Sequence, residues 1–284
     1  MNTFWSAGKL LLSGEYWVLY GAEALAVPTV RGQRLTFAEG PEPLQWTARD
    51  GAGRAWLDAP AAQLPELQRV LEAARALGGR VAESGRVETD LEFDRAWGWG
   101  SSSTLTDLVA QWTGVDPMRL HFATSQGSGF DVACARAHSA ILYRKTGAER
   151  AEWSPVASKH WPTAHFGLVY LGAKQDSQRE VARSRRSPSP HELDEVSGLS
   201  RTLAAAADVA AWREGMLELE ARTAAWLEQP RVQERFKDAP ATLKSLGAWG
   251  GDFALAVADD PADLAYFSER GYQTMPWTEC VNLP

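Results

Sequence analysis

A short loop rich in glycine and serine is the first segment of this sequence that could do chemistry. Residues 97–104 read Trp-Gly-Trp-Gly-Ser-Ser-Ser-Thr and follow an alternating strand pattern at residues 87–93. Apolar residues then recur at helical spacing, so the loop is expected to open a helix. Backbone N–H groups at such a helix start favour an anion. The pattern predicts a phosphate or nucleotide site, and a simple turn with a serine cap is the alternative. It matches neither the Walker loop nor the dinucleotide fingerprint.

Two charged residues lie in similar surroundings. Asp131 follows a second glycine loop, residues 127–129, at an expected helix start. Its carboxylate is either a general base for a substrate hydroxyl or a charge that complements the helix dipole. Lys9 lies among apolar residues, so its ammonium either reaches solvent or pairs with a carboxylate or phosphate.

The elements that must position these residues follow from the periodicity. The chain begins with a strand, a glycine turn and an apolar strand over residues 4–30. Helical spacing predicts a helix over residues 64–77 and two long helices after Pro190. Residues 153–162 are interpreted as a loop at a lobe boundary. Further strands are expected at residues 35–37, 44–47, 54–57, 139–143, 166–171 and 253–257.

Composition and charge limit the class of protein. The 284 residues suit one large domain or two lobes. The formal net charge of −7 disfavours nucleic-acid binding, which needs a cationic face. The two cysteines lack metal-site spacing and are expected to be reduced thiols. We expect a cytoplasmic protein with a small-molecule partner and no membrane or nucleic-acid partner. Its oligomeric state cannot be read from the sequence.

Three segments together resemble the GHMP kinase superfamily, which contains galactokinase, homoserine kinase, mevalonate kinase and phosphomevalonate kinase. Residues 6–28 resemble the first motif of that family, residues 98–104 resemble its phosphate-binding motif, and residues 244–256 resemble its third motif. Residues 126–144 and 172–180 resemble segments of the phosphomevalonate kinase branch.

This resemblance implies an α+β fold of two lobes. Residues 1–155 would form a ribosomal protein S5 domain 2-like N-terminal lobe that carries the phosphate-binding loop. Residues 156–284 would form a ferredoxin-like C-terminal lobe.

The resemblance also implies roles for individual residues. Asp131 would be the catalytic base, and Lys9 would lie beside it and stabilise charge on the transferring phosphoryl group. The ATP phosphates would be held by Gly98, Gly100, Ser101, Ser102 and Ser103. Ser102 would also reach Mg²⁺. Substrate binding would fall to Glu15, Ser128, Lys174, Ser177, Arg179, Gly247, Gly250 and Gly251.

The implied activity is ATP- and Mg²⁺-dependent phosphoryl transfer to a small anionic acceptor such as phosphomevalonate or mevalonate. The alternatives are a nucleotide or metabolite sensor without turnover and a decarboxylase that first phosphorylates a diphosphate substrate. The chain departs from the family pattern at Trp99 in the second motif and at Trp249 and Asp252 in the third. Asp252 is either a metal ligand or a solvent-facing or capping carboxylate.

Overall fold

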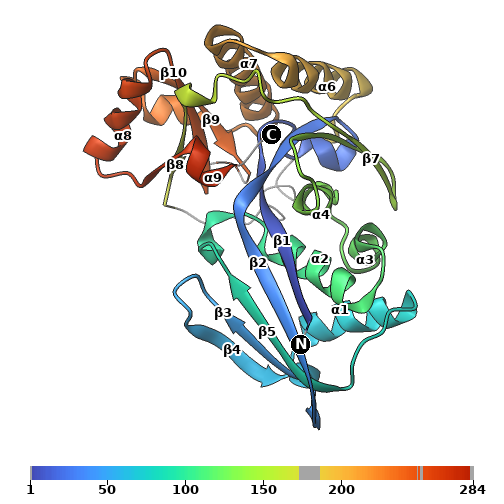
Figure 1. Cartoon of the computed structure of the whole chain (residues 1–284). Coiled ribbons are helices and arrows are strands. Elements are labelled where there is room, and N and C mark those ends of the chain that lie inside the picture. Colours follow the sequence, from blue (N-terminus) through green and yellow to red (C-terminus); the bar gives the residue numbers. More distant parts are fainter. Residues whose placement is uncertain (1, 173–185, 248, 250–251, 282–284) are drawn as a thin grey trace. The chain divides into compact units, whose positions relative to one another are not determined.

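The computed structural model describes residues 2–172, 186–247, 249 and 252–281, and these residues form two compact units (Figure 1). Unit 1 comprises residues 1–9, 29–95 and 99–136. Unit 2 comprises residues 10–28, 96–98 and 137–284. The compact units therefore interleave along the sequence, whereas the expected division into residues 1–155 and 156–284 is continuous. That division stays a prediction.

Unit 1 is built on a sheet in which β3 runs parallel to β5 and the other registered pairs are antiparallel. The strand order is β4-β3-β5-β2, and β1 pairs with β2. Alternation of buried and exposed residues along β5 leaves one face of that strand for the core. The strands are β1 (Asn2–Leu11), β2 (Ala24–Pro43), β3 (Gln45–Arg49), β4 (Ala55–Pro60) and β5 (Ser84–Leu91).

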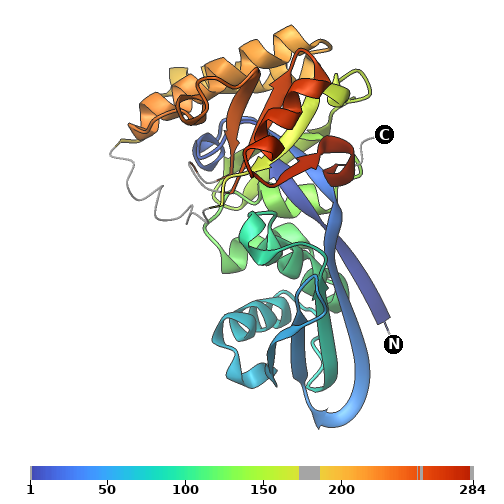
Figure 2. The same ribbon diagram turned by 90° about the vertical axis from the view of Figure 1, so that its left-hand side faces the viewer.

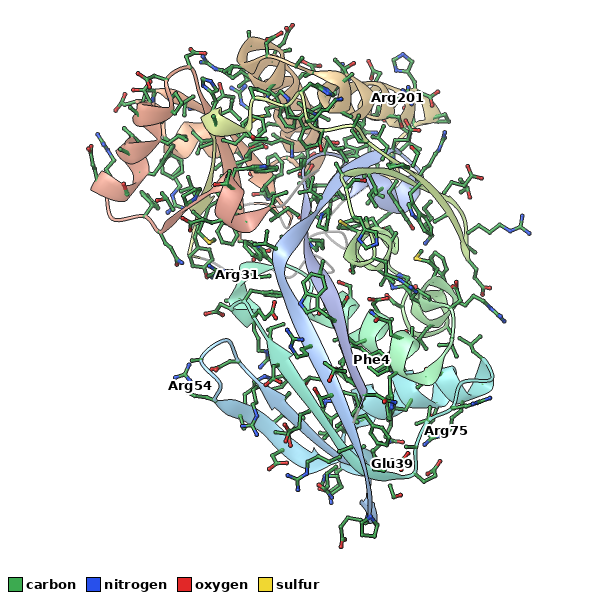
Figure 3. All side chains as sticks on the ribbon, in the orientation of Figure 1. Phe4, Arg31, Glu39, Arg54, Arg75 and Arg201 are labelled. Carbon is green, nitrogen blue, oxygen red and sulfur yellow. The ribbon has the colours of Figure 1, made fainter. Side chains whose placement is uncertain are left out.

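Helices cover one face of this sheet (Figures 1 and 2). The core of unit 1 joins Leu35 and Val87 from the strands to Leu71 and Leu108 from the helices, all fully buried. Phe4 of β1 packs against the same core (Figure 3). The helices are α1 (Pro65–Ala76), α2 (Ser101–Thr113), α3 (Pro117–Thr124) and α4 (Phe130–Ala135), with short 3₁₀ turns η2 (Ala61–Gln63) and η3 (Arg95–Trp97).

Unit 2 contains the turn η1 (Trp17–Tyr20) and the remaining strands of the seven-stranded sheet. In that sheet the first residues of β2 pair with β6 (Ile141–Gly147), and β6 pairs with β7 (Arg150–Pro155). The prediction of a loop over residues 153–162 is wrong at its start, because residues 153–155 belong to β7. Trp153 lies opposite Tyr143, and the two rings stack with centroids 6.1 Å apart. Such cross-strand pairs stabilise a sheet.

The rest of unit 2 is a four-stranded antiparallel sheet in the order β11-β8-β10-β9. Taken in chain order, these strands give the 4-1-3-2 arrangement of a ferredoxin-like sheet. This confirms the expected α+β class. The strands are β8 (Phe166–Tyr170), β9 (Ala241–Leu246), β10 (Phe253–Ala258) and β11 (Thr274–Pro276).

Helices α6 (Pro190–Ala205) and α7 (Val209–Leu227) connect β8 to β9 and lie side by side (Figure 1). Ser189 caps α6 through a capping box with Glu192, which explains why the helix begins at Pro190. None of the helices in the described part of the chain is long and apolar enough to cross a membrane. The remaining elements are η4 (Thr163–His165), η5 (Val232–Arg235), η6 (Pro261–Leu264), α8 (Ala265–Glu269) and α9 (Trp277–Cys280).

Candidate active site

The glycine/serine loop opens α2 as expected. Gly100 is the N-cap in the left-handed region (φ 89°), and its carbonyl accepts the N–H of Thr104 at 2.9 Å. Ser103 is buried, and its hydroxyl donates to the Gly100 carbonyl at 2.8 Å. Ser101 is half-buried and Ser102 is exposed, so these two hydroxyls remain accessible to a ligand. Ser103 can therefore contribute its backbone N–H, but its hydroxyl proton is already used.

Lys9 lies beside this loop in unit 1. Its backbone N–H donates to the Trp99 carbonyl at 3.0 Å. A Cβ built on Gly100 would lie 3.2 Å from Lys9 Cγ and 2.6 Å from Ser103 Oγ, so only glycine lets the loop pass this close. The Lys9 ammonium lies 5.3 Å from the centroid of the Phe130 ring, which belongs to the first turn of α4. Lys9 thus lies between the glycine/serine loop and the start of α4.

Asp131 is the second residue of α4, directly after Phe130. Gly129 caps the helix with φ 86°, and the N–H of Val132 donates to Asp131 Oδ1 at 3.0 Å. The Asp131 side chain is half-buried, and the neighbouring Ser128 is buried. Asp131 therefore combines a fixed orientation with partial access to solvent.

The pKa of the Cys134 thiol is affected by the charges of both Lys9 and Asp131. Burial raises the pKa of its thiol, the Lys9 charge lowers it, and the Asp131 charge raises it. Both side chains therefore act electrostatically on one buried thiol of α4. The structure brings together in unit 1 the two residues predicted to be catalytic.

The buried carboxylate of Asp107 contacts residues of β1, α2 and α4. Asp107 of α2 accepts a hydrogen bond from Gln111 Nε2 at 2.7 Å, and Gln111 also donates to the Trp5 carbonyl of β1 at 3.0 Å. Arg136, at the end of α4, approaches Asp107 to 3.7 Å. Burial raises the pKa of Asp107, against the lowering effects of Ser6, Gln111 and Arg136. Asp107 thereby links the strand of Lys9 with the helices of the loop and of Asp131.

In unit 2, residues of the first and third motifs form a buried ion pair. Lys244 and Glu15 are both almost fully buried and bind each other, and the Lys244 ammonium also donates to the Ser245 carbonyl at 2.9 Å. Glu220 of α7 accepts the N–H of Ser245 at 3.0 Å. Burial raises the pKa of Glu220, whereas Lys244 lowers it. Glu15 thus lies in a closed network, and its predicted substrate-binding role stays a prediction.

Asp252 lies against the glycines of two motifs in unit 2. A Cβ built on Gly98, whose φ is +67°, would lie 2.0 Å from Asp252 Oδ2 and 2.5 Å from its Cγ. A Cβ on Gly247 would lie 3.4 Å from the same oxygen. Asp252 is only 8% exposed, so the solvent-facing alternative does not apply. Its carboxylate occupies the space above Gly98.

The tryptophans of the motifs pack inward. Trp99 is buried in unit 1, where its ring lies 5.8 Å from that of Phe93. In unit 2, the backbone N–H of Trp249 donates to the Tyr16 hydroxyl at 2.7 Å, and its indole donates to the Pro230 carbonyl at 3.0 Å. These side chains therefore anchor the loops that carry them.

Several predicted residues lie outside the described part of the chain: Lys174, Ser177, Arg179, Gly250 and Gly251.

The described residues fit the phosphates of a nucleotide. Gly100 provides a close approach, the first N–H groups of α2 point out of the helix, and Lys9 supplies positive charge. The described residues contain no cluster of three or more His, Cys, Asp or Glu side chains that could hold a metal ion without help from a ligand. Besides the Ser102 hydroxyl, a magnesium ion would depend on phosphate oxygens and water.

Sequence reasoning assigned no role to Asp107, Lys244 or Glu220. Asp107 lies outside the apolar stripe of its helix and therefore has the appearance of a solvent-facing residue. It is buried because β1 and α4 also pack around α2. The signal that could have found Lys244 is its place within an apolar strand pattern, where an unpaired ammonium is costly.

Comparison with known proteins gives the context of this geometry. No protein-family model matches the chain, and neither does any curated protein sequence. Solved structures do match. The phosphomevalonate kinase of Streptococcus pneumoniae, in complex with phosphomevalonate and AMPPNP, superposes with a TM-score of 0.72 at 19% identity and covers 97% of this chain and 99% of its own.

Two further solved structures superpose on almost the whole chain. The mevalonate kinase of Methanococcus jannaschii has a TM-score of 0.72 at 11% identity, covering 100% of this chain and 98% of its own. The galactokinase of Lactococcus lactis, complexed with galactose, has a TM-score of 0.65 at 12% identity, covering 96% and 91%. At identities this low, the superpositions establish the shared fold, and they extend over almost the whole length of both chains. The three motifs therefore predicted the architecture correctly, and the chain has the GHMP kinase fold.

Proposed function

We propose that this chain is an ATP-dependent small-molecule kinase that transfers a phosphoryl group to a hydroxyl or phosphate of a small anionic acceptor. The observation that carries the proposal is the position of Lys9, which lies against Gly100 of the phosphate loop and 5.3 Å from the ring next to Asp131. A cation at this place can serve both a phosphoryl group and a base. The structures of similar fold are kinases, which supports this reading.

Bound ATP would supply the transferable phosphoryl group. In the proposed reaction, the acceptor oxygen forms the new bond to phosphorus and the bond to the ADP oxygen breaks. With a hydroxyl acceptor such as mevalonate, Asp131 takes the proton of the attacking hydroxyl, whereas an ionised phosphate acceptor has no proton to give up. The bond from the Val132 N–H holds the Asp131 carboxylate in place. Lys9 stabilises the negative charge on the transferring group, and Ser101 and Ser102 orient the phosphates.

For the acceptor, we propose phosphomevalonate or mevalonate. The support is the resemblance of residues 126–144 to phosphomevalonate kinases and the match to a structure solved with phosphomevalonate. Mg²⁺ as the accompanying ion and a cytoplasmic location belong to the same proposal.

One observation favours a second candidate, a nucleotide or metabolite sensor without turnover. The Asp252 carboxylate lies above Gly98, where it brings negative charge to a loop predicted to hold phosphates. Like charges at short range oppose ATP binding in the usual family manner. A kinase therefore requires Asp252 to move or to bind a cation when the nucleotide enters.

The experiment that separates these functions measures ADP formation with mevalonate, with phosphomevalonate and without acceptor. Asp131→Asn and Lys9→Met are compared with Glu66→Gln, an exposed carboxylate of α1. We expect acceptor-dependent ADP formation that, with mevalonate as the acceptor, falls by about 10²–10⁴-fold in Asp131→Asn and stays unchanged in Glu66→Gln. ATP binding without turnover on any anionic alcohol would refute the kinase and support the sensor. Release of CO₂ with ADP from diphosphomevalonate would identify the decarboxylase alternative.

A further inference from the structure

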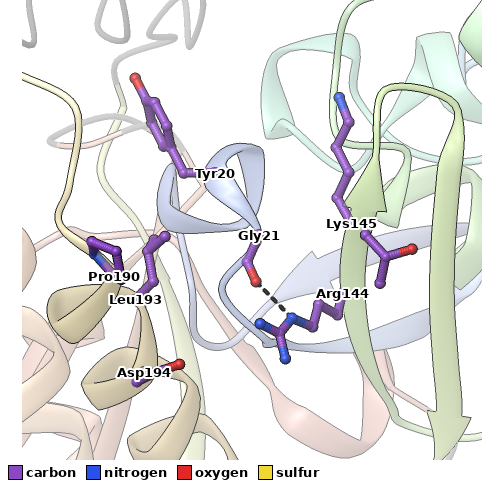
Figure 4. A pocket seen from close by; sticks show the side chains of 8 residues that line it. Tyr20, Gly21, Arg144, Lys145, Pro190, Leu193 and Asp194 are labelled. Carbon is purple, nitrogen blue, oxygen red and sulfur yellow. Dashed lines mark hydrogen bonds between the residues drawn. The ribbon is translucent and has the colours of Figure 1, made fainter.

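A pocket of unit 2 shares no lining residue with the candidate active site. It is formed by residues of η1, β6 and α6, and Arg144 donates there to the Gly21 carbonyl at 2.9 Å (Figure 4). Asp194 lines the same pocket, so charges of both signs meet the space and no single class of ligand is favoured. A more selective arrangement lies in unit 1.

His121 is a buried polar side chain of unit 1 to which the proposed reaction assigns no role. It belongs to α3 and is only 6% exposed. Its Nε2 is shielded from solvent and has no hydrogen-bond partner among the described residues. Leaving a buried polar atom without a partner is costly, so an unpaired nitrogen in a folded chain requires an explanation.

The unpaired nitrogen lies against Gly127, in the loop between α3 and α4. A Cβ built on Gly127 would lie 3.5 Å from His121 Nε2 and 3.3 Å from its Cε1. The same point lies 3.2 Å from the hydroxyl oxygen of Ser125, whose side chain is exposed. Two polar groups therefore converge on the position that a side chain of residue 127 would occupy.

The backbone does not require glycine at this position. Gly127 is not among the glycines with positive φ, whereas Gly129, two residues further on, has a φ of 86°. What glycine provides at position 127 is space beside the edge of the imidazole ring. An oxygen atom placed there, unlike a Cβ fixed to the backbone, can approach both polar groups to hydrogen-bond distance.

Both polar groups can donate to such an oxygen. The His121 imidazole is a donor when its proton is on Nε2. The Ser125 oxygen accepts the N–H of Gly127 at 3.0 Å, which leaves the hydroxyl proton to be donated. Two donors suit an oxygen that carries no proton, as in a carboxylate or a phosphate. The loop continues to Gly129, the N-cap of α4, whose second residue is the proposed base Asp131.

We propose that His121 and Ser125 bind an anionic oxygen of the phosphoryl acceptor in the space beside Gly127. A carboxylate or phosphate of the acceptor supplies this oxygen, and the hydrogen bond to it gives the buried Nε2 its partner. The inference rests on the proposed kinase function, because it assigns to the acceptor of that reaction an anchor that is separate from the reacting oxygen.

The test follows acceptor binding and the state of the imidazole in the whole chain. Protein labelled with ¹⁵N-histidine is titrated, with and without AMPPNP, with mevalonate, which carries a carboxylate, and with phosphomevalonate, which carries a phosphate as well. His121→Leu identifies the His121 signals in the NMR spectrum and removes the donor. Gly127→Ala fills the space with a methyl group. Gly40→Ala is the matched control, because Gly40 also belongs to unit 1, lacks a positive φ and would place its Cβ 3.6 Å from the nearest atom.

We expect acceptor binding to shift the Nε2 signal of His121 while this nitrogen keeps its proton. Gly127→Ala and His121→Leu should each weaken acceptor binding by about tenfold or more, and Gly40→Ala should leave it unchanged. Urea unfolding checks that each variant is folded. A His121 signal that responds to neither acceptor would overturn the inference, and so would an Nε2 that accepts a proton from the ligand or an affinity that survives both Gly127→Ala and His121→Leu.

ADP formation by the natural chain separates this inference from the function on which it rests. Turnover of an acceptor with an unresponsive His121 would refute the anchor and leave the kinase intact. Acceptor binding that shifts the His121 signal without any turnover would support the anchor and refute the kinase.

Discussion

The contact between Asp252 and Gly98 can be tested by adding a single methyl group. Gly98→Ala places a Cβ 2.0 Å from Asp252 Oδ2 and 2.5 Å from its Cγ, well inside any allowed contact. It also forces an alanine to adopt a φ of +67°. The substitution therefore carries two separate costs, a backbone cost and a steric cost.

The two costs have different magnitudes, and only the steric cost is removed by replacing Asp252. Left-handed backbone costs an alanine about 1–2 kcal/mol. Moving the Asp252 side chain out of its rotamer adds about 0.5–1.5 kcal/mol, before the loss of its contacts. We expect Gly98→Ala to lower the free energy of unfolding by about 2–4 kcal/mol in the natural chain, and by only about 1–2 kcal/mol when Asp252 is replaced by glycine.

Urea unfolding, followed by circular dichroism, measures the four proteins of this double-mutant cycle. Gly271→Ala is the matched control, because Gly271 belongs to the same unit, has φ +81° and has nothing within 4 Å of a built Cβ. It reports the backbone cost alone. If Gly98→Ala costs no more than Gly271→Ala, or costs the same with and without Asp252, the carboxylate does not lie above Gly98.

Three further predictions concern buried polar groups. Lys244→Met should lower the free energy of unfolding by about 3–5 kcal/mol because it leaves Glu15 buried and unpaired. Adding Glu15→Gln to this variant should recover part of the loss, as measured by urea unfolding. If the double variant loses as much stability as Lys244→Met alone, the pairing is contradicted. Burial raises the folded-state pKa of Asp107, so its contribution to stability is present at low pH and lost as the pH rises through that pKa. Asp107→Asn should therefore gain stability relative to the natural chain as the pH rises above about 4, and a pH-independent difference would refute this. Tyr16→Phe removes the acceptor of the Trp249 N–H and should cost about 1–3 kcal/mol in thermal or urea unfolding, whereas no loss would show that another group accepts that bond.

Local pattern explains much of what could be predicted. Alternation along residues 87–93 and helical spacing after Gly100 correctly placed a strand, a loop and a helix in that order, because these periodicities are properties of consecutive residues. Glycines at 100 and 129 predicted the two turns that start helices, and both have positive φ. The loop expected over residues 153–162 was wrong only for residues 153–155, since pairing with a partner strand is a property of the fold and not of the segment.

The orientations of the motif tryptophans, Trp99 and Trp249, could not be predicted from the sequence. Their position inside the predicted nucleotide loops raised the question of whether they obstruct them, and the fold answers it by packing Trp99 on Phe93 and by bonding Trp249 to Pro230. Which way a side chain points from a loop depends on the surfaces that surround the loop, and these come from distant parts of the chain.

By itself, the sequence determined the α+β class, the order of the motifs and the residue types available for phosphoryl transfer. Only the tertiary structure decided which of these residues meet: Lys9 with the ring beside Asp131, Glu15 with Lys244, and Asp252 with Gly98. The physical reason is that ion pairing and steric exclusion act over a few ångströms in space, whereas Glu15 and Lys244 stand 229 positions apart in the chain.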